Sequence, residues 1–213
     1  MASLSGTGLL ADDLFLMAHD DVTGRPFLQP RAIGLGLAGG LLAELMLSGQ
    51  LGMSRGVVIA TNPGAPDGQL AGDVLSLVFT ERDRHPVCDW LAFLARRAAA
   101  DVAVRLVGAG YLQEAWSRRR RRSGQWVPVD ADCAFASLSR ARPALEAAGA
   151  TAYSATLAGL AVACGLGTRL LPCGPPDARL RVRDAVARLP PSVQELIAQT
   201  QAAVDKAVLI HRV

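Results

Sequence analysis

The chain carries, at residues 9–52, the stretch LLADDLFLMAHDDVTGRPFLQPRAIGLGLAGGLLAELMLSGQLG. Leu10, Leu14 and Met17 recur in it at helical spacing, which predicts a helix over about 8–19. The acidic segment 20–26, which contains Gly and Pro, has turn chemistry and ends that helix. A second apolar helix is predicted from about 30 to 48 and stops near Gly49. These residues therefore predict two apolar helices joined by a short turn.

Composition extends this prediction to the whole chain. The 213 residues are 51% hydrophobic and 19% charged, enough apolar material for one substantial core. Only 5% are aromatic, so Leu, Ala and Val must fill that core, and Leu and Ala favour helices. The net charge of +3 is carried almost entirely by arginine, because Lys206 is the only lysine. We expect a single domain over residues 1–213, with guanidinium groups that suit phosphate.

Cysteine spacing and the N-terminus indicate the compartment. The four cysteines form no CxxC pair and precede no zinc-type histidine pattern, so we expect no metal site and no cofactor. Residues 1–8 lack the basic segment of a secretory signal, which favours a cytoplasmic protein with reduced, buried thiols. Residues 32–53 and 149–171 are apolar but diluted by polar or small residues, and we interpret both as buried core helices.

The remaining segments alternate between helical patterns and breaks. Residues 52–60 predict a short hairpin, and residues 70–80 a helix with a cap near Asp73. Pro86 fits the first turn of a long helix whose apolar stripe continues to Leu106. A second hairpin is predicted at about 111–130, with Pro128 on an edge strand, followed by helices at about 132–148, 151–171, 177–188 and 191–209. The predicted fold is mainly α, a single-domain helical bundle with one or two small β-hairpins.

Catalytic motifs in the sequence lack the structural context that they need. GxGxxG at residues 34–39 has no preceding strand and no acidic residue about 20 positions later, so close helix packing explains its glycines better. GxSxG at residues 52–56 follows a helix and precedes a strand, the reverse of a nucleophile elbow, and is better explained as a hairpin turn. Asp12 and Asp13 point in different directions on a helix. We expect them to be solvated or to lie near the start of the helix, where the helix dipole stabilises anions. We therefore expect no enzyme and no catalytic residue.

The strongest charge feature is a run of five arginines at the tip of the second predicted hairpin. Trp116 and Trp126 flank this run, which consists of Arg118, Arg119, Arg120, Arg121 and Arg122. Basic side chains contribute about 1 kcal/mol each on an anionic membrane, and tryptophan suits the interface. Nucleic-acid phosphates and plain solvation are the alternatives, and we favour the membrane surface over both.

Four blocks in order along the chain carry a resemblance to a known family. They are LLADDLFLMAHDDVTG at the start, GLAGGLLAELMLSGQL at 36–51, AGDVL at 71–75 and LVGAGYL at 106–112. The sequence resembles the Golgi phosphoprotein 3 family, whose members are helical, peripheral proteins that bind phosphatidylinositol 4-phosphate. The resemblance implies that the family's aromatic headgroup residue falls on Gln29 and its three arginines on Ala38, Arg96 and Ala99. Only Arg96 keeps the family residue.

The resemblance therefore implies a cytoplasmic protein that binds anionic phospholipid headgroups at the membrane surface. The expected headgroup residues are Arg96, with Arg97, Arg31, Gln29 and Phe27 nearby in sequence, Phe27 standing in for the missing aromatic. The family hairpin is implied in self-association, so a homo-oligomer is possible through residues 111–130. The alternative is a soluble, oligomerising adaptor module that has lost phosphoinositide binding, which the residues at 29, 38 and 99 favour. No protein partner is evident from the sequence.

Overall fold

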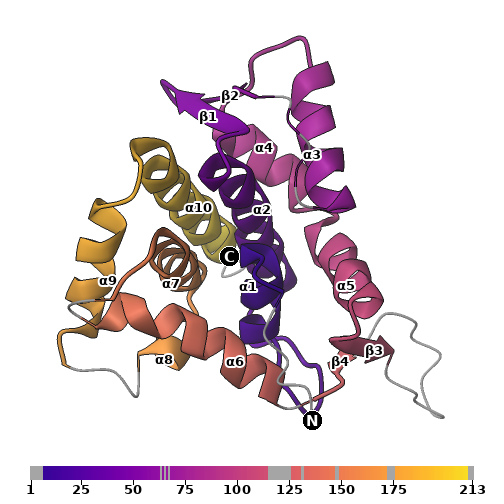
Figure 1. Cartoon of the computed structure of the whole chain (residues 1–213), viewed down its shortest axis with the longest axis vertical. Helices are drawn as coiled ribbons and strands as arrows, with labels where there is room; N and C mark the ends of the chain where they lie inside the picture. Colours follow the sequence, from indigo (N-terminus) through magenta and orange to yellow (C-terminus); the bar gives the residue numbers. More distant parts are fainter. Residues whose placement is uncertain are drawn as a thin grey trace.

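The computed structural model describes residues 7–62, 64, 66, 68–114, 126–130, 132–146, 149–171 and 176–210. Its elements, in chain order, are α1 (Leu10–Ala18), α2 (Pro30–Leu47), β1 (Leu51–Ser54), β2 (Val57–Ala60), α3 (Gln69–Thr80), α4 (Val87–Leu94), α5 (Ala98–Gly108), β3 (Leu112–Glu114), β4 (Trp126–Pro128), α6 (Asp132–Ala141), the 3₁₀ helix η1 (Arg142–Leu145), α7 (Ala152–Cys164), α8 (Gly167–Leu170), α9 (Ala178–Ala187) and α10 (Pro191–Ile210). The prediction of a mainly α single domain with two small antiparallel hairpins is confirmed (Figure 1).

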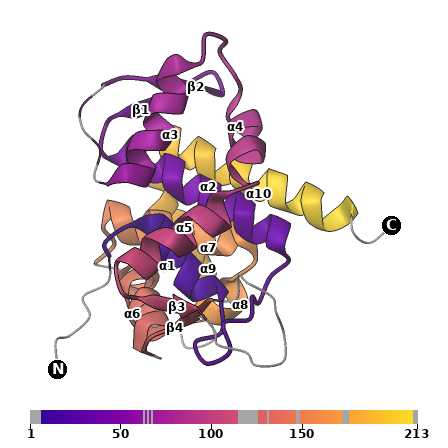
Figure 2. The same cartoon turned by 90° about the vertical axis from the view of Figure 1, so that its right-hand side faces the viewer.

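Helix α2 lies at the centre of the bundle. It packs against α1, α3, α4, α5, α7 and α10, which surround it in both views (Figures 1 and 2). Its sequence is apolar on all sides, as expected of a helix buried all round. Within the described residues, α2 is the one helix long and apolar enough to cross a bilayer, and 78% of it is buried inside the protein. This burial agrees with the interpretation of the apolar segment as a core helix, but the helix ends at Leu47, and residues 48–53 form a turn and the start of β1.

The glycines of α2 allow its neighbours to approach closely. A Cβ atom on Gly39 would lie 2.8 Å from Oγ1 of Thr200, and one on Gly40 would lie 3.0 Å from Cα of Ala11. A Cβ on Gly36 would collide with the sulfur of Cys164. Such contacts leave no room for a methyl group in a close-packed interior. The GxGxxG pattern is therefore a packing surface inside a helix, as the sequence predicts.

Both hairpins form where the sequence predicts them. In the first, Ser54 pairs with Val57, and the two turn residues have positive φ angles, 52° at Arg55 and 76° at Gly56. This is the geometry of a type I′ turn, which matches the twist of the strands. The GxSxG pattern is thus a hairpin turn. In the second, Leu112 pairs with Pro128 at the sheet edge.

Several predicted boundaries are wrong. The long helix predicted from Pro86 to Leu106 is two helices, because residues 95–97 form a turn between α4 and α5. The helix predicted over 151–171 ends at Gly165, which has a φ of 95° and terminates α7 before α8. The segment predicted as one helix over 132–148 is α6 followed by η1. Gly68, and not Asp73, precedes the first residue of α3.

The two hairpins mark opposite ends of the molecule. The β1–β2 hairpin lies beside α3 and α4 at one end, whereas the β3–β4 hairpin lies below α5 and near the start of α6 at the other (Figures 1 and 2). Helices α2 and α5 connect the two ends.

Candidate functional site

The start of α2 is an exposed, positively polarised helix end. Gln29 occupies the N-cap position and makes no side-chain cap, and Pro30 fills the first helical position. Both residues and Arg31 are exposed. The first amides of a helix carry a partial positive charge and attract anions. This end therefore combines a helix dipole with the guanidinium group of Arg31.

The α4–α5 turn brings two further arginines close to this helix end. A Cβ atom on Gly34 would lie 2.5 Å from the carbonyl oxygen of Ala95, so the turn rests directly on α2. Arg31 precedes Gly34 by three residues and shares its face of the helix. Arg96 and Arg97, which follow Ala95, are both exposed. The structure thus gathers three of the predicted headgroup residues around one contact.

The three arginines differ in how free they are to bind a ligand. NH2 of Arg97 lies 3.5 Å from Oδ1 of Asp101, but the arginine side chain is 82% exposed, so this pair is weak. Arg31 and Arg96 form no ion pair with any residue that the structure describes. These two guanidinium groups are the ones available to an incoming anion.

Phe27 has a partner that the sequence did not reveal. The guanidinium carbon of Arg169, in α8, lies 3.6 Å from the centroid of the Phe27 ring, which places a cation over an aromatic face. Phe27 is 40% exposed, and Arg169 is exposed. The spacing between these residues gives no hint of their contact. Arg169 in α8 adds a further positive charge next to Phe27, which lies on the chain segment that leads into α2.

Two positions carried over from the family lie in the interior. Ala38 is completely buried, and Ala99 is half-buried and packs against the core. Ala38 lies one helical turn beyond Gly34 on α2, behind the exposed group. A long basic side chain has no matching space at Ala38. The candidate site in this chain is therefore an open surface at Arg31 and Arg96, and it lacks the arginines that the family has at positions 38 and 99.

The predicted membrane-surface residues can be placed only in part. Trp116 and Arg118–Arg122 fall within 115–125, outside the described residues. Trp126, on β4, is partly buried and packs against the core. A Cβ on Gly24 would collide with the Trp126 carbonyl, so the turn after α1 lies against β4. Val22 on this turn is 76% exposed.

Asp12 and Asp13 lie in the first turn of α1, as predicted, but the expectation that they are solvated is wrong. Both are completely buried. Arg105 in α5 donates from Nε to Oδ1 of Asp12 at 2.8 Å, and Arg140 in α6 forms a two-pronged ion pair with Asp13. Buried charges require such partners, because burial alone is costly. The two carboxylates point to different helices, as the sequence predicts, and they tie α1 to α5 and α6.

Each buried carboxylate has a different degree of hydrogen bonding. Asp13 also accepts from Tyr153 at 2.6 Å and from Ser137 at 3.1 Å. The burial of the Tyr153 hydroxyl, together with the Asp13 charge, raises the Tyr153 pKa. Burial also raises the pKa of Asp12, against the opposing effect of Arg105. The network therefore holds a well-satisfied pair at Asp13 and a more strained pair at Asp12.

Glu44 completes this network beside a cavity. Its Oε1 accepts from the Ala11 amide at 2.8 Å, and its Oε2 lies 3.5 Å from NH1 of Arg105. Burial raises the Glu44 pKa to about 7, although Arg105 opposes the shift. A cavity of about 380 Å³ opens next to Glu44 and Tyr153. The Glu44 carboxylate accepts the hydrogen bond of a free amide at the start of α1, which is a structural role that the sequence did not predict.

The prediction that all the thiols are buried is wrong for one of them. Cys133 and Cys164 are buried, but Cys88 is exposed on the outward side of α4, with its sulfur 3.6 Å from Oδ1 of Asp89. Cys173 lies outside the described residues.

Comparison with protein families gives one match. A family model described as Golgi phosphoprotein 3 (GPP34) matches residues 10–209, nearly the whole chain. No individual curated protein matches the sequence.

Proposed function

We propose that this chain, which belongs to the Golgi phosphoprotein 3 family, is a peripheral membrane protein that binds anionic phospholipid headgroups. The observation that carries the proposal is the contact of the turn that bears Arg96 with Gly34, three residues after Arg31, close to the uncapped start of α2. Phosphatidylinositol 4-phosphate is the headgroup that the family resemblance favours. The proposal assigns no catalytic role to the GxGxxG and GxSxG patterns, because the first serves helix packing and the second forms a hairpin turn.

Two features support an anionic ligand at this surface. Charge-assisted hydrogen bonds from guanidinium to phosphate are stronger than neutral ones, and Arg31 and Arg96 are free to make them. The amides at the start of α2 add a fixed positive potential that needs no side-chain rearrangement. With Ala38 and Ala99 in place of arginines, fewer bonds reach the headgroup. We therefore expect binding that follows the density of negative charge more than the position of one phosphate.

The arrangement of the surface also supports attachment at the bilayer face. Val22 and Phe27 are exposed apolar side chains on the turn between α1 and α2, and Arg169 lies over the Phe27 ring. Exposed apolar groups beside cations suit the headgroup region, where the apolar part can insert and the charge meets phosphate. The five-arginine run would add attraction from the second hairpin.

A soluble, oligomerising adaptor module is the second candidate function. The complete burial of Ala38 favours it, since one family arginine position has become part of the core. The two functions differ in their dependence on lipid. An adaptor without lipid binding would form a stable oligomer in light scattering and would not float with any vesicle.

Vesicle flotation tests the proposal. Vesicles of phosphatidylcholine alone are compared with vesicles that also contain phosphatidylserine or phosphatidylinositol 4-phosphate. The Arg31→Ser/Arg96→Ser variant should lose at least about tenfold in affinity for anionic vesicles, because two phosphate contacts are removed. Arg179→Ser/Arg183→Ser removes the same charge from the exposed side of α9 and serves as the matched control. Equal losses in both variants, or binding that ignores anionic lipid, would contradict the proposal.

A further inference from the structure

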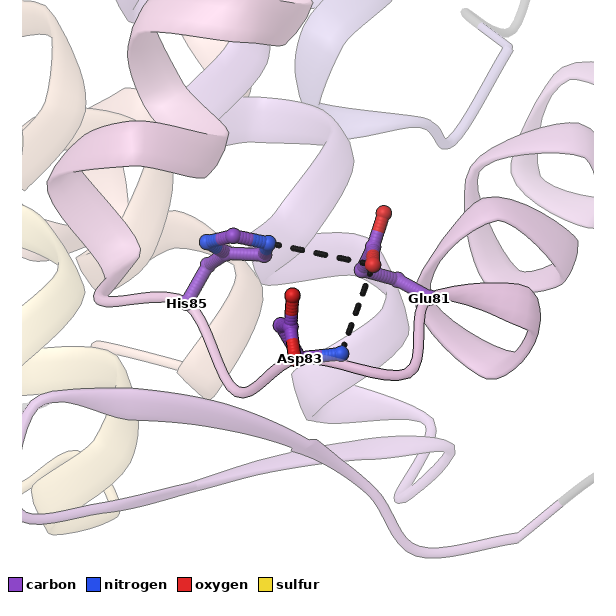
Figure 3. A group of neighbouring side chains, drawn as sticks. All are labelled: Glu81, Asp83 and His85. Atoms are coloured by element: carbon purple, nitrogen blue, oxygen red, sulfur yellow. Dashed lines mark hydrogen bonds and ion pairs between the residues drawn. The ribbon is translucent and has the colours of Figure 1, made fainter.

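A cluster of metal-ligating side chains lies at the other end of the molecule, between α3 and α4. Glu81, Asp83 and His85 extend from one short loop toward the same point (Figure 3). One ligand atom from each lies within 4.8 Å of the other two, and Nε2 of His85 is 3.9 Å from Oε1 of Glu81. Cysteine and histidine spacing in the sequence does not reveal this group, because its donors are two carboxylates and one imidazole.

Both ends of this loop are fixed by secondary structure. Glu81 follows the last residue of α3, and its amide donates to the Leu77 carbonyl at 3.1 Å. Pro86 precedes the first residue of α4 and bridges to Val57 in β2. The ring of His85 packs edge-on against Trp90, with centroids 6.2 Å apart. The imidazole is therefore held in place from outside the cluster.

The two carboxylates of the cluster offer oxygen ligands to a cation, although Arg82 and Arg84 in the same loop balance their charge. Oε1 of Glu81 lies 3.9 Å from Nε2 of His85 and accepts from the Asp83 amide at 3.3 Å, and no arginine pairs with Glu81 or Asp83 in the part of the chain that the structure describes. Two adjacent carboxylates repel each other, and a cation between them removes that repulsion. An imidazole nitrogen beside them adds a donor that transition metals bind well and that Mg²⁺ and Ca²⁺ do not favour.

A hollow next to the cluster leaves space for further ligands. It has a volume of about 390 Å³, and Glu81, His85 and Asp89 line it together with the side chains of Trp90 and Phe93. Phe93 is 50% exposed, so the hollow is open to solvent. A bound ion would have three protein donors on the loop side and room for water or a small ligand on the hollow side. This is the arrangement of an open rather than a closed metal site.

We propose that Glu81, Asp83 and His85 form a binding site for a divalent transition-metal ion, with Zn²⁺ as the probe of choice. Around an ion with bonds of about 2.1 Å, tetrahedral ligand atoms are about 3.4 Å apart. The 3.9 Å separation between His85 and Glu81 reaches this value by a small side-chain rotation. The carboxylates and the imidazole match the oxygen and nitrogen ligands of such ions.

The test is a competition titration of the full-length, tag-free chain with Zn²⁺ against a coloured chelator. We expect one ion per chain, and Mg²⁺ in excess should not displace it. His85→Ala and Asp83→Asn should each weaken binding by about tenfold or more, since each removes a ligand. Asp205→Asn, at an exposed acidic position on α10, is the matched control and should bind like the unaltered chain. Far-UV circular dichroism of each variant verifies folding.

Cys88 provides the main competing explanation, because its exposed thiol is also a zinc ligand. Cys88→Ser should leave the affinity unchanged. Loss of binding in Cys88→Ser, or full binding in His85→Ala, would overturn the proposal. Since this site and Arg96 lie on different elements, neither result depends on whether the chain binds lipid.

Discussion

Replacement of Glu44 by Gln should change how the stability of the protein depends on pH. Burial raises the Glu44 pKa from its ordinary value of 4.5 to about 7 in the folded state. The folded state therefore holds a proton that the unfolded chain releases. The stability that this proton contributes is fully present below the Glu44 pKa of the unfolded chain. It is lost as the pH rises through the Glu44 pKa of the folded state.

The size of the effect follows from the shift. One unit of pKa difference corresponds to about 1.4 kcal/mol. Between about pH 5 and pH 8, Glu44 should lower the free energy of unfolding by about 2 to 3 kcal/mol. Gln keeps an oxygen for the Ala11 amide but does not titrate, so Glu44→Gln should lack this loss. His19, whose pKa burial lowers, acts in the opposite direction, and its effect is common to both proteins.

Urea unfolding followed by circular dichroism, repeated across this pH range, measures the difference. The unaltered chain should lose stability relative to Glu44→Gln as pH rises. Glu146→Gln, at an exposed position, is the control and should follow the unaltered chain. Parallel pH profiles for Glu44→Gln and the unaltered chain would refute the reasoning, because Glu44 would then be ionised in the folded state at all these pH values.

Three further results are expected from the same unfolding assay. Arg140→Leu should lower the free energy of unfolding by about 3 to 5 kcal/mol, because it strands a buried carboxylate, whereas Arg97→Leu should cost less than about 1 kcal/mol; similar losses would contradict the assignment of the buried pair. Gly36→Ala should cost about 1 to 3 kcal/mol through its collision with the Cys164 sulfur, and Cys164→Ala in the same chain should recover part of it. Gly108→Ala, where a methyl group meets nothing within 4 Å, should not destabilise, and a loss there would contradict the packing explanation.

The helical architecture was accessible from the sequence because its signals are local. The apolar sequence of α2 predicts a buried core helix, and residues 52–60 predict a short hairpin because β-branched residues cluster at 57–59. The break at residues 95–97 has no such signal, since alanine and arginine both favour helices. It depends on a tertiary contact, the approach of Ala95 to Gly34.

The candidate sites were less accessible, because their partners are distant in sequence. Asp12 and Arg105 are 93 positions apart, and nothing local distinguishes a buried aspartate that has such a partner from a solvated one. Phe27 and Arg169 meet only because α8 folds back to the turn before α2. Arg96 was identified by resemblance, and the contact of its turn with Gly34, three residues after Arg31, required the structure.

The most direct measurement is a heteronuclear NMR titration of the isotope-labelled chain with a soluble, short-chain phosphatidylinositol 4-phosphate. We predict that amide shifts will be concentrated at residues 29–32 and 95–97, with smaller changes near Phe27. Shifts that spread over the arginines of α9, or that leave residues 29–32 and 95–97 unchanged at saturating ligand, would contradict a phosphate site at the start of α2.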